Sequence, residues 1–338
     1  MSRHVNIPIF IPHLGCPNQC VFCNQRTISG VSEFDESCVK DQIDEALSTI
    51  EPDAEVEIAF FGGSFTGIDR DLMVSLLAAA YEYIKSGRVG AIRCSTRPDY
   101  IDEEILAILK KYGVKTIELG LQSASDHVLA LTKRGHDFEA ERRACRMIVD
   151  AGFSLVGQMM IGLPGADIAS EIMTAEFIVS MSAMSARIYP TVVFRETELC
   201  KMAECGEYRP LTLDEAIERS ATVLEIFDAA GVNVIRIGLA ASENLSSPET
   251  YYAGPNHSSL GELIENELYY RKIKKLLTDK NISGDSIINV FVSKGSLSKA
   301  VGQKKKNRLR LENDFPCADM RFGESDSISG YSVLVNIS

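Results

Sequence analysis

The sequence predicts an α/β fold in which a partial barrel of six βα units precedes a small α+β domain. Strand-like and helix-like runs alternate over residues 1–245, polar or glycine-rich residues follow the strands, and the composition changes after residue 246. Such alternation favours a parallel sheet covered by helices, with an active site at the carboxyl ends of the strands. The 338 residues suffice for one large domain and one small domain.

The strand-like runs of the predicted barrel are short, apolar and rich in β-branched residues. They span residues 5–11, 56–61, 91–95, 116–121, 155–161, 187–194 and 232–237. The helix-like runs between them have apolar residues at helical spacing, and several end at glycine. They span residues 37–50, 71–84, 103–112, 138–151, 169–181 and 213–230. Together they predict six successive βα units and a last strand.

A linker and a small basic unit follow the predicted barrel. Residues 246–284 contain a Ser-, Pro- and Gly-rich linker and then an amphipathic helix. Residues 285–338 form the predicted α+β domain. Its expected elements are a strand at 287–292, a short helix at 296–301, a loop at 302–305, a helix at 307–313 and a strand at 331–337.

Charge is distributed unevenly along the chain. The net charge of −12 argues against a nucleic-acid platform over the whole surface. Residues 246–338, however, carry 13 Lys/Arg against 11 Asp/Glu, whereas the preceding residues carry 22 against 36. Residues 286–311 contain no acidic residue and seven basic ones: Lys294, Lys299, Lys304, Lys305, Lys306, Arg308 and Arg310. This asymmetry predicts a separate partner for the basic part.

The composition also predicts a cytoplasmic protein without a membrane partner. No run of 18 or more apolar residues is present, so no membrane span is expected. The first residues lack the layout of a secretory signal. Nine cysteines, six of them scattered, fit a reducing compartment.

Three cysteines lie within eight residues after the first predicted strand: Cys16, Cys20 and Cys23. Thiolates at this spacing can hold three irons of a four-iron cluster, which leaves the fourth iron open to chemistry. Zinc bound with His13 is an alternative, although structural zinc sites usually pair two-ligand knuckles a dozen or more residues apart. A disulfide is disfavoured, because neighbouring cysteines in a reducing compartment are more often ligands.

The second and third predicted strands end in motifs of their own. Residues 62–64 read Gly-Gly-Ser, and glycine lets the backbone approach a ligand closely. Arg97 follows the third strand, and either Asp99 or Asp102 is expected to cap the next helix.

The fourth and fifth predicted strands carry polar residues among apolar ones. Glu118 and Gln122, if they face inward, need partners that a bound polar ligand such as a ribose would supply. Arg134 follows in a Lys-Arg-Gly-His run, for which a solvated loop is the alternative interpretation. Gln158 interrupts an apolar strand, which predicts a ligand contact, and Gly162 begins a Gly-Leu-Pro-Gly turn.

The sixth predicted strand carries two further candidates for substrate contact, Tyr189 and Arg195. Core packing alone would explain Tyr189 equally well.

The cysteine loop, with an aromatic residue before its third cysteine, resembles that of the radical S-adenosylmethionine (radical SAM) superfamily. Between residues 6 and 239 the motifs Gly-Gly-Ser-Phe, Thr-Arg-Pro-Asp-Tyr, Glu-Leu-Gly-Leu-Gln-Ser, Lys-Arg-Gly-His and Ile-Tyr-Pro-Thr follow in order. This set resembles the Elongator catalytic subunit and the bacterial proteins labelled oxygen-independent coproporphyrinogen oxidase-like. The resemblance implies a radical SAM barrel.

The resemblance also implies cofactors and their contacts. Cys16, Cys20 and Cys23 would hold a [4Fe-4S] cluster, and S-adenosylmethionine (SAM) would bind at its open iron. The implied SAM contacts are Phe22, Gly62, Gly63, Ser64, Gln122, Arg134, Gln158 and Gly162. The Gly-Gly pair would take the methionine amino group, Arg134 the carboxylate and the Gly162 turn the adenine. The residue after the Gly-Gly pair is Glu in many superfamily members, whereas this chain has Ser64, as the Elongator-like branch does.

The implied activity is reductive cleavage of SAM to methionine and a 5′-deoxyadenosyl radical, which takes a hydrogen atom from the substrate. An electron donor such as flavodoxin or ferredoxin is implied as a partner. The substrate hypothesis is RNA, with tRNA first, because of the Elongator-like motifs and the basic tail. A small metabolite such as a porphyrin is the alternative, with the tail serving as a lid or a dimer contact.

Residues 300–311 resemble the helix–loop–helix of a degenerate KH-type RNA-binding unit, whose Gly-x-x-Gly loop clamps a nucleic-acid backbone. Lys305 replaces the second glycine, so Lys304, Lys305, Lys306 and Arg308 would contact phosphates instead. A solvated basic face is the alternative. Acetyl transfer is not expected, because residues 246–338 lack a glycine-rich acetyl-CoA loop and are too few for Elongator's acetyltransferase domain.

Overall fold

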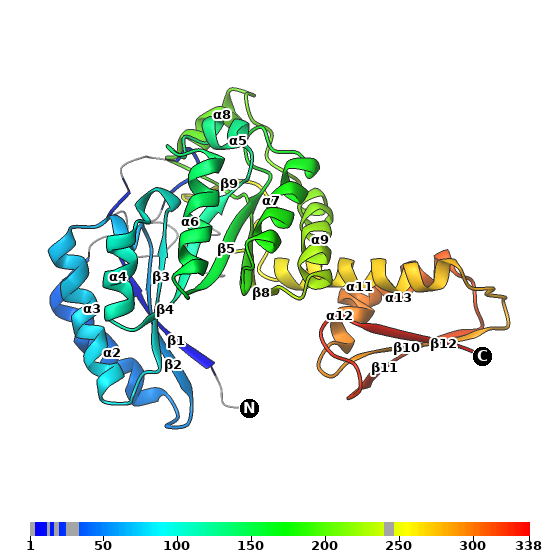
Figure 1. Cartoon of the computed structure of the whole chain (residues 1–338). Coiled ribbons are helices and arrows are strands. Elements are labelled where there is room, and N and C mark those ends of the chain that lie inside the picture. Colours follow the sequence, from blue (N-terminus) through cyan, green and yellow to red (C-terminus); the bar gives the residue numbers. More distant parts are fainter. Residues whose placement is uncertain (1–3, 12–13, 17–19, 25–33, 240–246) are drawn as a thin grey trace.

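A computed structural model shows a curled half-barrel joined through one long helix to a small C-terminal unit (Figure 1). It describes residues 4–11, 14–16, 20–24, 34–239 and 247–338. Seven parallel strands pair in chain order, so the predicted partial barrel is confirmed. They are β1 (His4–Phe10), β2 (Glu55–Phe61), β3 (Ala91–Thr96), β4 (Val114–Gln122), β5 (Ser154–Ile161), β6 (Ser185–Pro190) and β8 (Asn233–Ile237).

Helices cover the outer face of this sheet (Figure 1). They are α2 (Val39–Thr49), α3 (Arg70–Lys85), α4 (Glu103–Lys111), α6 (Phe138–Asp150), α7 (Ile168–Ser180) and α9 (Leu213–Ala229), whereas the short helices α5 (Asp126–Leu131) and α8 (Glu198–Glu204) lie at the top of the barrel in this view (Figure 1). Side-chain caps fix several starts. Asp102 accepts from the Ile105 amide at 2.7 Å, and Thr212 with Glu215 forms a capping box at α9. Asp102 is therefore the cap expected before α4, whereas Asp99 pairs with Arg97.

The core lies between the sheet and these helices. Ile58, Phe60 and Ile92 are fully buried, as expected for strands of a parallel sheet with both faces covered. Burying one such side chain stabilises the fold by about 1.5–3 kcal/mol. No described helix has both the length and the apolar character that a bilayer crossing requires.

Two expectations for the connecting segments are wrong. The run at 187–194 is not one strand: β6 ends at Pro190, and β7 (Val193–Phe194) pairs with β9 (Tyr251–Ala253). Proline cannot donate to a strand ladder, which favours the break. The segment expected to be a linker thus contains β9, which forms a separate two-stranded antiparallel sheet with β7.

The C-terminal unit is α+β, as predicted, and the helix α11 (Leu260–Thr278) joins it to the barrel (Figure 1). Its sheet has the order β11-β10-β12, with β10 and β11 parallel and β12 antiparallel. The remaining elements are β10 (Ile287–Ser293), α12 (Leu297–Val301), the 3-10 turn η4 (Gln303–Lys305), α13 (Lys306–Asp314), β11 (Asp319–Ser325) and β12 (Val333–Ile337).

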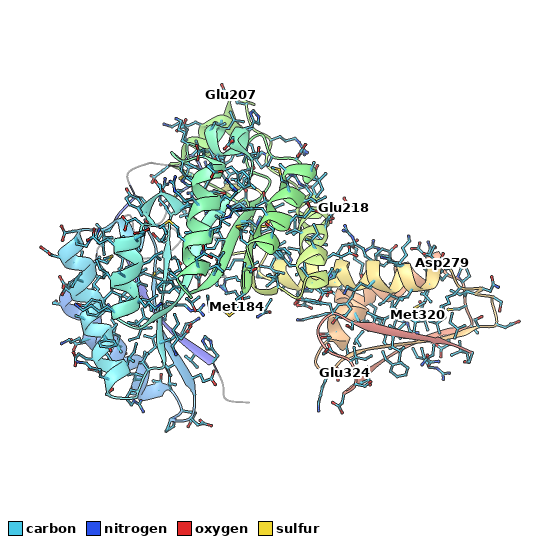
Figure 2. The ribbon with its side chains drawn as sticks, viewed as in Figure 1. Met184, Glu207, Glu218, Asp279, Met320 and Glu324 are labelled. Carbon is cyan, nitrogen blue, oxygen red and sulfur yellow. The ribbon has the colours of Figure 1, made fainter. Side chains whose placement is uncertain are left out.

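Polar contacts fix α11 to the barrel helix α9. Arg271 donates to Thr222 Oγ1 at 2.8 Å and to the Glu218 carbonyl at 3.0 Å, and Lys272 pairs with Asp228. Glu218 lies on the side of the barrel that faces α11, and Asp279 marks the far end of that helix (Figure 2). The C-terminal unit is therefore attached through side-chain contacts as well as through the chain.

Candidate functional site

The strand-end motifs meet at one edge of the sheet. The register pairs Phe10 with Phe61, Thr96 with Leu119 and Ile161 with Pro190, so the carboxyl ends of neighbouring strands are aligned. The cysteine loop follows β1 and the Gly-Gly-Ser motif follows β2 at this same edge. The edge is where a site in a parallel barrel is expected.

The second half of the cysteine loop is anchored at this edge. Val21 donates to the Thr132 carbonyl at 3.2 Å and accepts from the Leu199 amide at 2.8 Å. Phe22 packs against the small apolar cluster that contains Val21, Val193 and Leu199. The loop is thus tied to the segments that contain α5 and α8.

The three predicted ligands differ in exposure: Cys16 is exposed, Cys20 is buried and Cys23 is intermediate. The residues that the structure describes hold no group of three His, Cys, Asp or Glu side chains arranged around a metal position. His13, the zinc alternative, and the residues between Cys16 and Cys20 lie outside the described parts. The cysteine ligand set therefore stays a prediction.

Two arginines approach the buried cysteine. Arg134 Nη1 donates to Cys20 Sγ at 3.3 Å, and Arg97 Nη1 lies 3.9 Å from the same sulfur. Both arginines are buried. Arg134 is an expected SAM contact, whereas the sequence motifs indicate no role for Arg97, although the two guanidinium groups share one sulfur.

A line of polar side chains extends from Arg97 into the core. Arg97 donates two 2.9 Å hydrogen bonds to Asp99, and His136 lies 3.4 Å from Asp99 and 3.1 Å from Glu141. Although burial acts against it, hydrogen bonds from His136 and Arg97 hold the pKa of Asp99 well below its usual range. Burial raises the pKa of Glu141 to about 7, against the effect of His136.

The glycines of the Gly-Gly-Ser motif accommodate close backbone contacts. A Cβ on Gly63 would lie 2.5 Å from the Leu14 carbonyl oxygen, and one on Gly62 would lie 3.2 Å from the Ile11 nitrogen. Ser64 is fully buried, and its hydroxyl shares a 2.8 Å hydrogen bond with Thr96. In this structure the motif joins the end of β2 to the cysteine loop and to β3.

Gln122 Oε1 and Arg134 Nε at the same edge are buried and lack partners among the described residues, as does Thr191 Oγ1 directly after β6. Gln122 has a φ of +71°, a left-handed conformation that is uncommon outside glycine. Arg134 Nη2 donates to the Gly120 carbonyl, so only part of the guanidinium is satisfied. Buried polar groups are rarely left unpaired, and a polar ligand would satisfy both Gln122 and Arg134. The residues at this edge therefore fit a ligand such as SAM.

Gln158 lies in a second network, centred on the buried carboxylate of Glu118. Arg93 donates to Glu118 at 2.9 Å, Arg187 donates at 2.9 Å, and Gln158 Nε2 donates at 3.1 Å. Arg93 also pairs with Glu57 at 2.6 Å. Glu118 thus finds its partners within the protein, and a bound ligand is not needed to satisfy it, contrary to expectation.

The two candidates of the sixth strand have structural partners. Arg195 donates to the Pro248 carbonyl at 2.9 Å and lies 5.5 Å from the Tyr252 ring centroid. It therefore holds the segment around β9. The Tyr189 hydroxyl accepts a 3.5 Å hydrogen bond from Arg187 Nη1, and burial raises the pKa of Tyr189.

The Gly162 turn is fixed by residues that sequence analysis missed. Its amide donates to Glu171 at 2.7 Å, and its carbonyl accepts from the Tyr208 hydroxyl at 2.6 Å. Arg219 pairs with Glu171 at 2.6 Å. The signal for Glu171 was present in the sequence, because a carboxylate on the inner face of a mostly apolar helix needs a buried partner.

Three lysines between α12 and α13 of the C-terminal unit, Lys304, Lys305 and Lys306, are exposed, and we call them the lysine turn. Among the other basic residues of the stretch, Lys299 pairs with Glu265 at 2.9 Å, and Lys294 lies 3.9 Å from Asp326 with both side chains exposed. Arg308 pairs with Glu312, and Arg310 pairs with Glu267, each at 2.7 Å. Of the predicted RNA contacts, Arg308 is therefore already neutralised.

The lysine turn has an unusual backbone. Lys304 and Lys305 both have positive φ values, +52° and +63°. A Cβ on Gly302, which begins the turn, would lie 2.9 Å from the Asn307 nitrogen. Lys305 thus adopts the left-handed conformation that glycine favours.

Comparison with known proteins places most of the chain in one family. The family model described as Radical SAM superfamily matches residues 10–178, and the model described as Radical_SAM C-terminal domain matches residues 184–270. The rest of the C-terminal unit, residues 271–338, lies beyond both matches.

Curated relatives match only in part. The tRNA uridine(34) acetyltransferase of Methanocaldococcus infernus is 33% identical over 218 residues, which cover 62% of this chain and 38% of that protein. Human Elongator complex protein 3 is 28% identical over 192 residues, covering 51% of this chain and 35% of that protein. The chain thus spans well under half the length of these relatives.

Among solved structures, the archaeal Methanocaldococcus infernus Elp3 superposes with a TM-score of 0.62 at 23% identity. The match covers 82% of this chain and 64% of that one. At this identity the likeness concerns the fold.

Proposed function

Because the chain belongs to the radical SAM superfamily, we propose that this enzyme binds a [4Fe-4S] cluster and SAM and modifies RNA, with tRNA as the first candidate. The observation that carries the site is the unpaired Gln122 Oε1 beside Arg134, which itself donates to Cys20. When bound, the reduced cluster and SAM supply a 5′-deoxyadenosyl radical, which abstracts a hydrogen atom from the substrate.

The chain's own residues bind and orient these groups. Cys16, Cys20 and Cys23 are the thiolates that would hold three irons. Arg134 Nε would donate to the SAM carboxylate, since it is buried and unpaired. Gln122 Oε1 would accept from a polar hydrogen of SAM. Phe22, Gly62, Gly63 and Gly162 belong to the same proposal, whereas the side chains of Ser64 and Gln158 are already hydrogen-bonded within the chain and would position the edge.

RNA is the proposed substrate class for two reasons. Two relatives named for tRNA uridine acetylation match 62% and 53% of this chain. The lysine turn also lies beside the start of α11, because Asn307 donates to the Asn266 carbonyl at 2.6 Å. A Cβ on Gly261 would lie 3.4 Å from the Ile237 carbonyl at the end of β8. Gly261 and Asn266 are separated along α11 by a helical rise of about 1.5 Å per residue. The lysine turn therefore lies about 8 Å along α11 from the end of β8.

Acetyl transfer is not part of the proposal. The lysine turn instead offers phosphate contacts, which are independent of base sequence. Because the match covers only 38% of the M. infernus relative, the whole activity of that protein is not assigned to this chain.

The first test measures SAM cleavage. The anaerobically reconstituted enzyme is reduced with dithionite in the presence of SAM, and 5′-deoxyadenosine is quantified by chromatography. We expect product that depends on reductant and is lost in a C16A/C20A/C23A variant. A fully clustered wild-type protein that forms no 5′-deoxyadenosine would overturn the assignment.

The second test measures tRNA binding by filter retention over a salt series. We compare the wild type with K304E/K305E/K306E and with K40E/K111E/K115E, a control that reverses three exposed lysines of the barrel. Loss of three phosphate contacts should reduce the salt slope by about 2–3. Equal, salt-insensitive binding by all three proteins would contradict the RNA proposal and favour a small-molecule substrate.

A further inference from the structure

Arg97 has no place among the proposed cofactor contacts, yet it lies against a predicted cluster ligand. Its Nη1 is 3.9 Å from Cys20 Sγ, and Arg134 Nη1 is 3.3 Å from that sulfur. The two arginines are 3% and 5% exposed, and Cys20 is 7% exposed. Two buried guanidinium groups therefore converge on one sulfur.

Arg97 is held firmly in this position. Asp99 accepts two hydrogen bonds from it, the Arg134 carbonyl accepts a third, and His136 Nδ1 lies 3.4 Å from its Nη2. His136 is itself paired with buried Glu141. The line of side chains from Glu141 to Asp99 thus fixes the orientation of the guanidinium.

Arg134 has no such counter-charge. In the described part of the chain its guanidinium contacts the Cys20 sulfur and the Gly120 carbonyl, and it forms no ion pair there. A buried cation without an anion is costly. Asp99 balances the charge of Arg97 but not that of Arg134. The two arginines together therefore favour a negatively charged sulfur at Cys20.

We propose that Arg97 and Arg134 are positioning residues that donate to the Cys20 sulfur and raise the reduction potential of the cluster that Cys20 ligates. The inference rests on the proposed function, because it requires a cluster at this loop. Reduction adds negative charge, and hydrogen bonds and positive charge at a ligand sulfur stabilise the reduced form. Arg97 is the better residue to test, since Arg134 is also a proposed SAM contact.

The test is an EPR-monitored potentiometric titration of the reconstituted cluster without SAM, so that activity plays no part. The series is wild type, R97K, R97Q and R97M, with R93M as the control. Arg93 lies in β3, which ends one residue before Arg97, and is 6% exposed, but it pairs with Glu57 and Glu118 rather than with a cysteine. Iron content and visible absorbance establish that each protein carries its cluster.

We expect R97M to reduce the equilibrium constant for one-electron reduction at least tenfold, a fall of about 59 mV. R97K should stay nearest the wild type, R97Q should lie between, and R93M should not shift. A flat series overturns the inference, as does an equal shift in R93M. If R97M loses its cluster, the reduction potentials of R97Q and R97K are compared instead. A lower potential in R97Q supports the inference, and equal potentials overturn it. A wild type without any [4Fe-4S] cluster instead refutes the proposed function, and the inference with it.

Discussion

Replacing Glu118 by glutamine should destabilise the barrel strongly. Glu118 is 1% exposed, and Arg187 Nε approaches its Oε2 to 2.8 Å while Arg93 Nη1 approaches its Oε1 to 2.9 Å. Glutamine keeps the shape but removes the charge, which leaves the mostly buried Arg187 without an anion, while Arg93 retains Glu57. Removing one member of a buried ion pair costs about 3–5 kcal/mol, a large part of a typical unfolding free energy of about 5–15 kcal/mol.

The assay is urea unfolding of the cluster-free protein followed by far-UV circular dichroism, because the chain has no tryptophan. An E118Q/R187M double variant should cost at least about 1 kcal/mol less than the sum of the two single variants. E104Q is the matched control, because its partner Arg70 is also an arginine, at 3.2 Å, but both side chains are exposed. That substitution should cost about 0–1 kcal/mol.

Two results would refute this reasoning. If E118Q lost no more unfolding free energy than E104Q, the buried carboxylate would contribute no more to stability than a surface carboxylate does. Additive single and double variants would mean that Glu118 and Arg187 do not act as a pair.

Three further variants test other features of the structure. Lys305→Gly should raise the unfolding free energy by about 0.5–1 kcal/mol in the same urea assay, because the left-handed conformation costs lysine more than glycine. Burial raises the pKa of Glu141 to about 7, so the native state holds a proton that the unfolded state releases from about pH 4.5 upward. The unfolding free energy of the wild type relative to E141Q should therefore fall as the pH rises from 5 to 7, and a flat difference would contradict the shift. Gly63→Ala should reduce the iron content after reconstitution, because its Cβ would meet the Leu14 carbonyl at 2.5 Å, whereas Gly284→Ala, with open space around it, should not.

Local pattern was sufficient for most of the barrel. The run at 155–161 corresponds to β5, and the run at 213–230 corresponds to α9, each within one residue at both ends. The superfamily resemblance is confirmed by the family models. Short elements were missed: α5 and α8 are too short for helical periodicity, and β11 contains charges that hide its alternation.

The side-chain networks could not be predicted, because they depend on register. Glu118, Arg93 and Arg187 come from three strands, and a shift of one residue in any strand would turn its side chain to the other face. Arg97 and Cys20 are 77 residues apart, and nothing in the sequence pattern links the arginine to the cysteine. Only the folded edge brings a guanidinium, a thiol and the His136–Glu141 pair into one line.

The polar groups at the strand ends divide according to whether the protein itself satisfies them. Glu118, Gln158 and Ser64 find their hydrogen-bond partners within the chain, so their replacement should act mainly on stability. Gln122 Oε1 and Arg134 Nε do not, and their burial already imposes a cost that a ligand would remove. Replacing these two should therefore cost less in folding than in ligand affinity. This division separates residues that position the edge from residues that receive a ligand, and it does so without reference to what any relative binds.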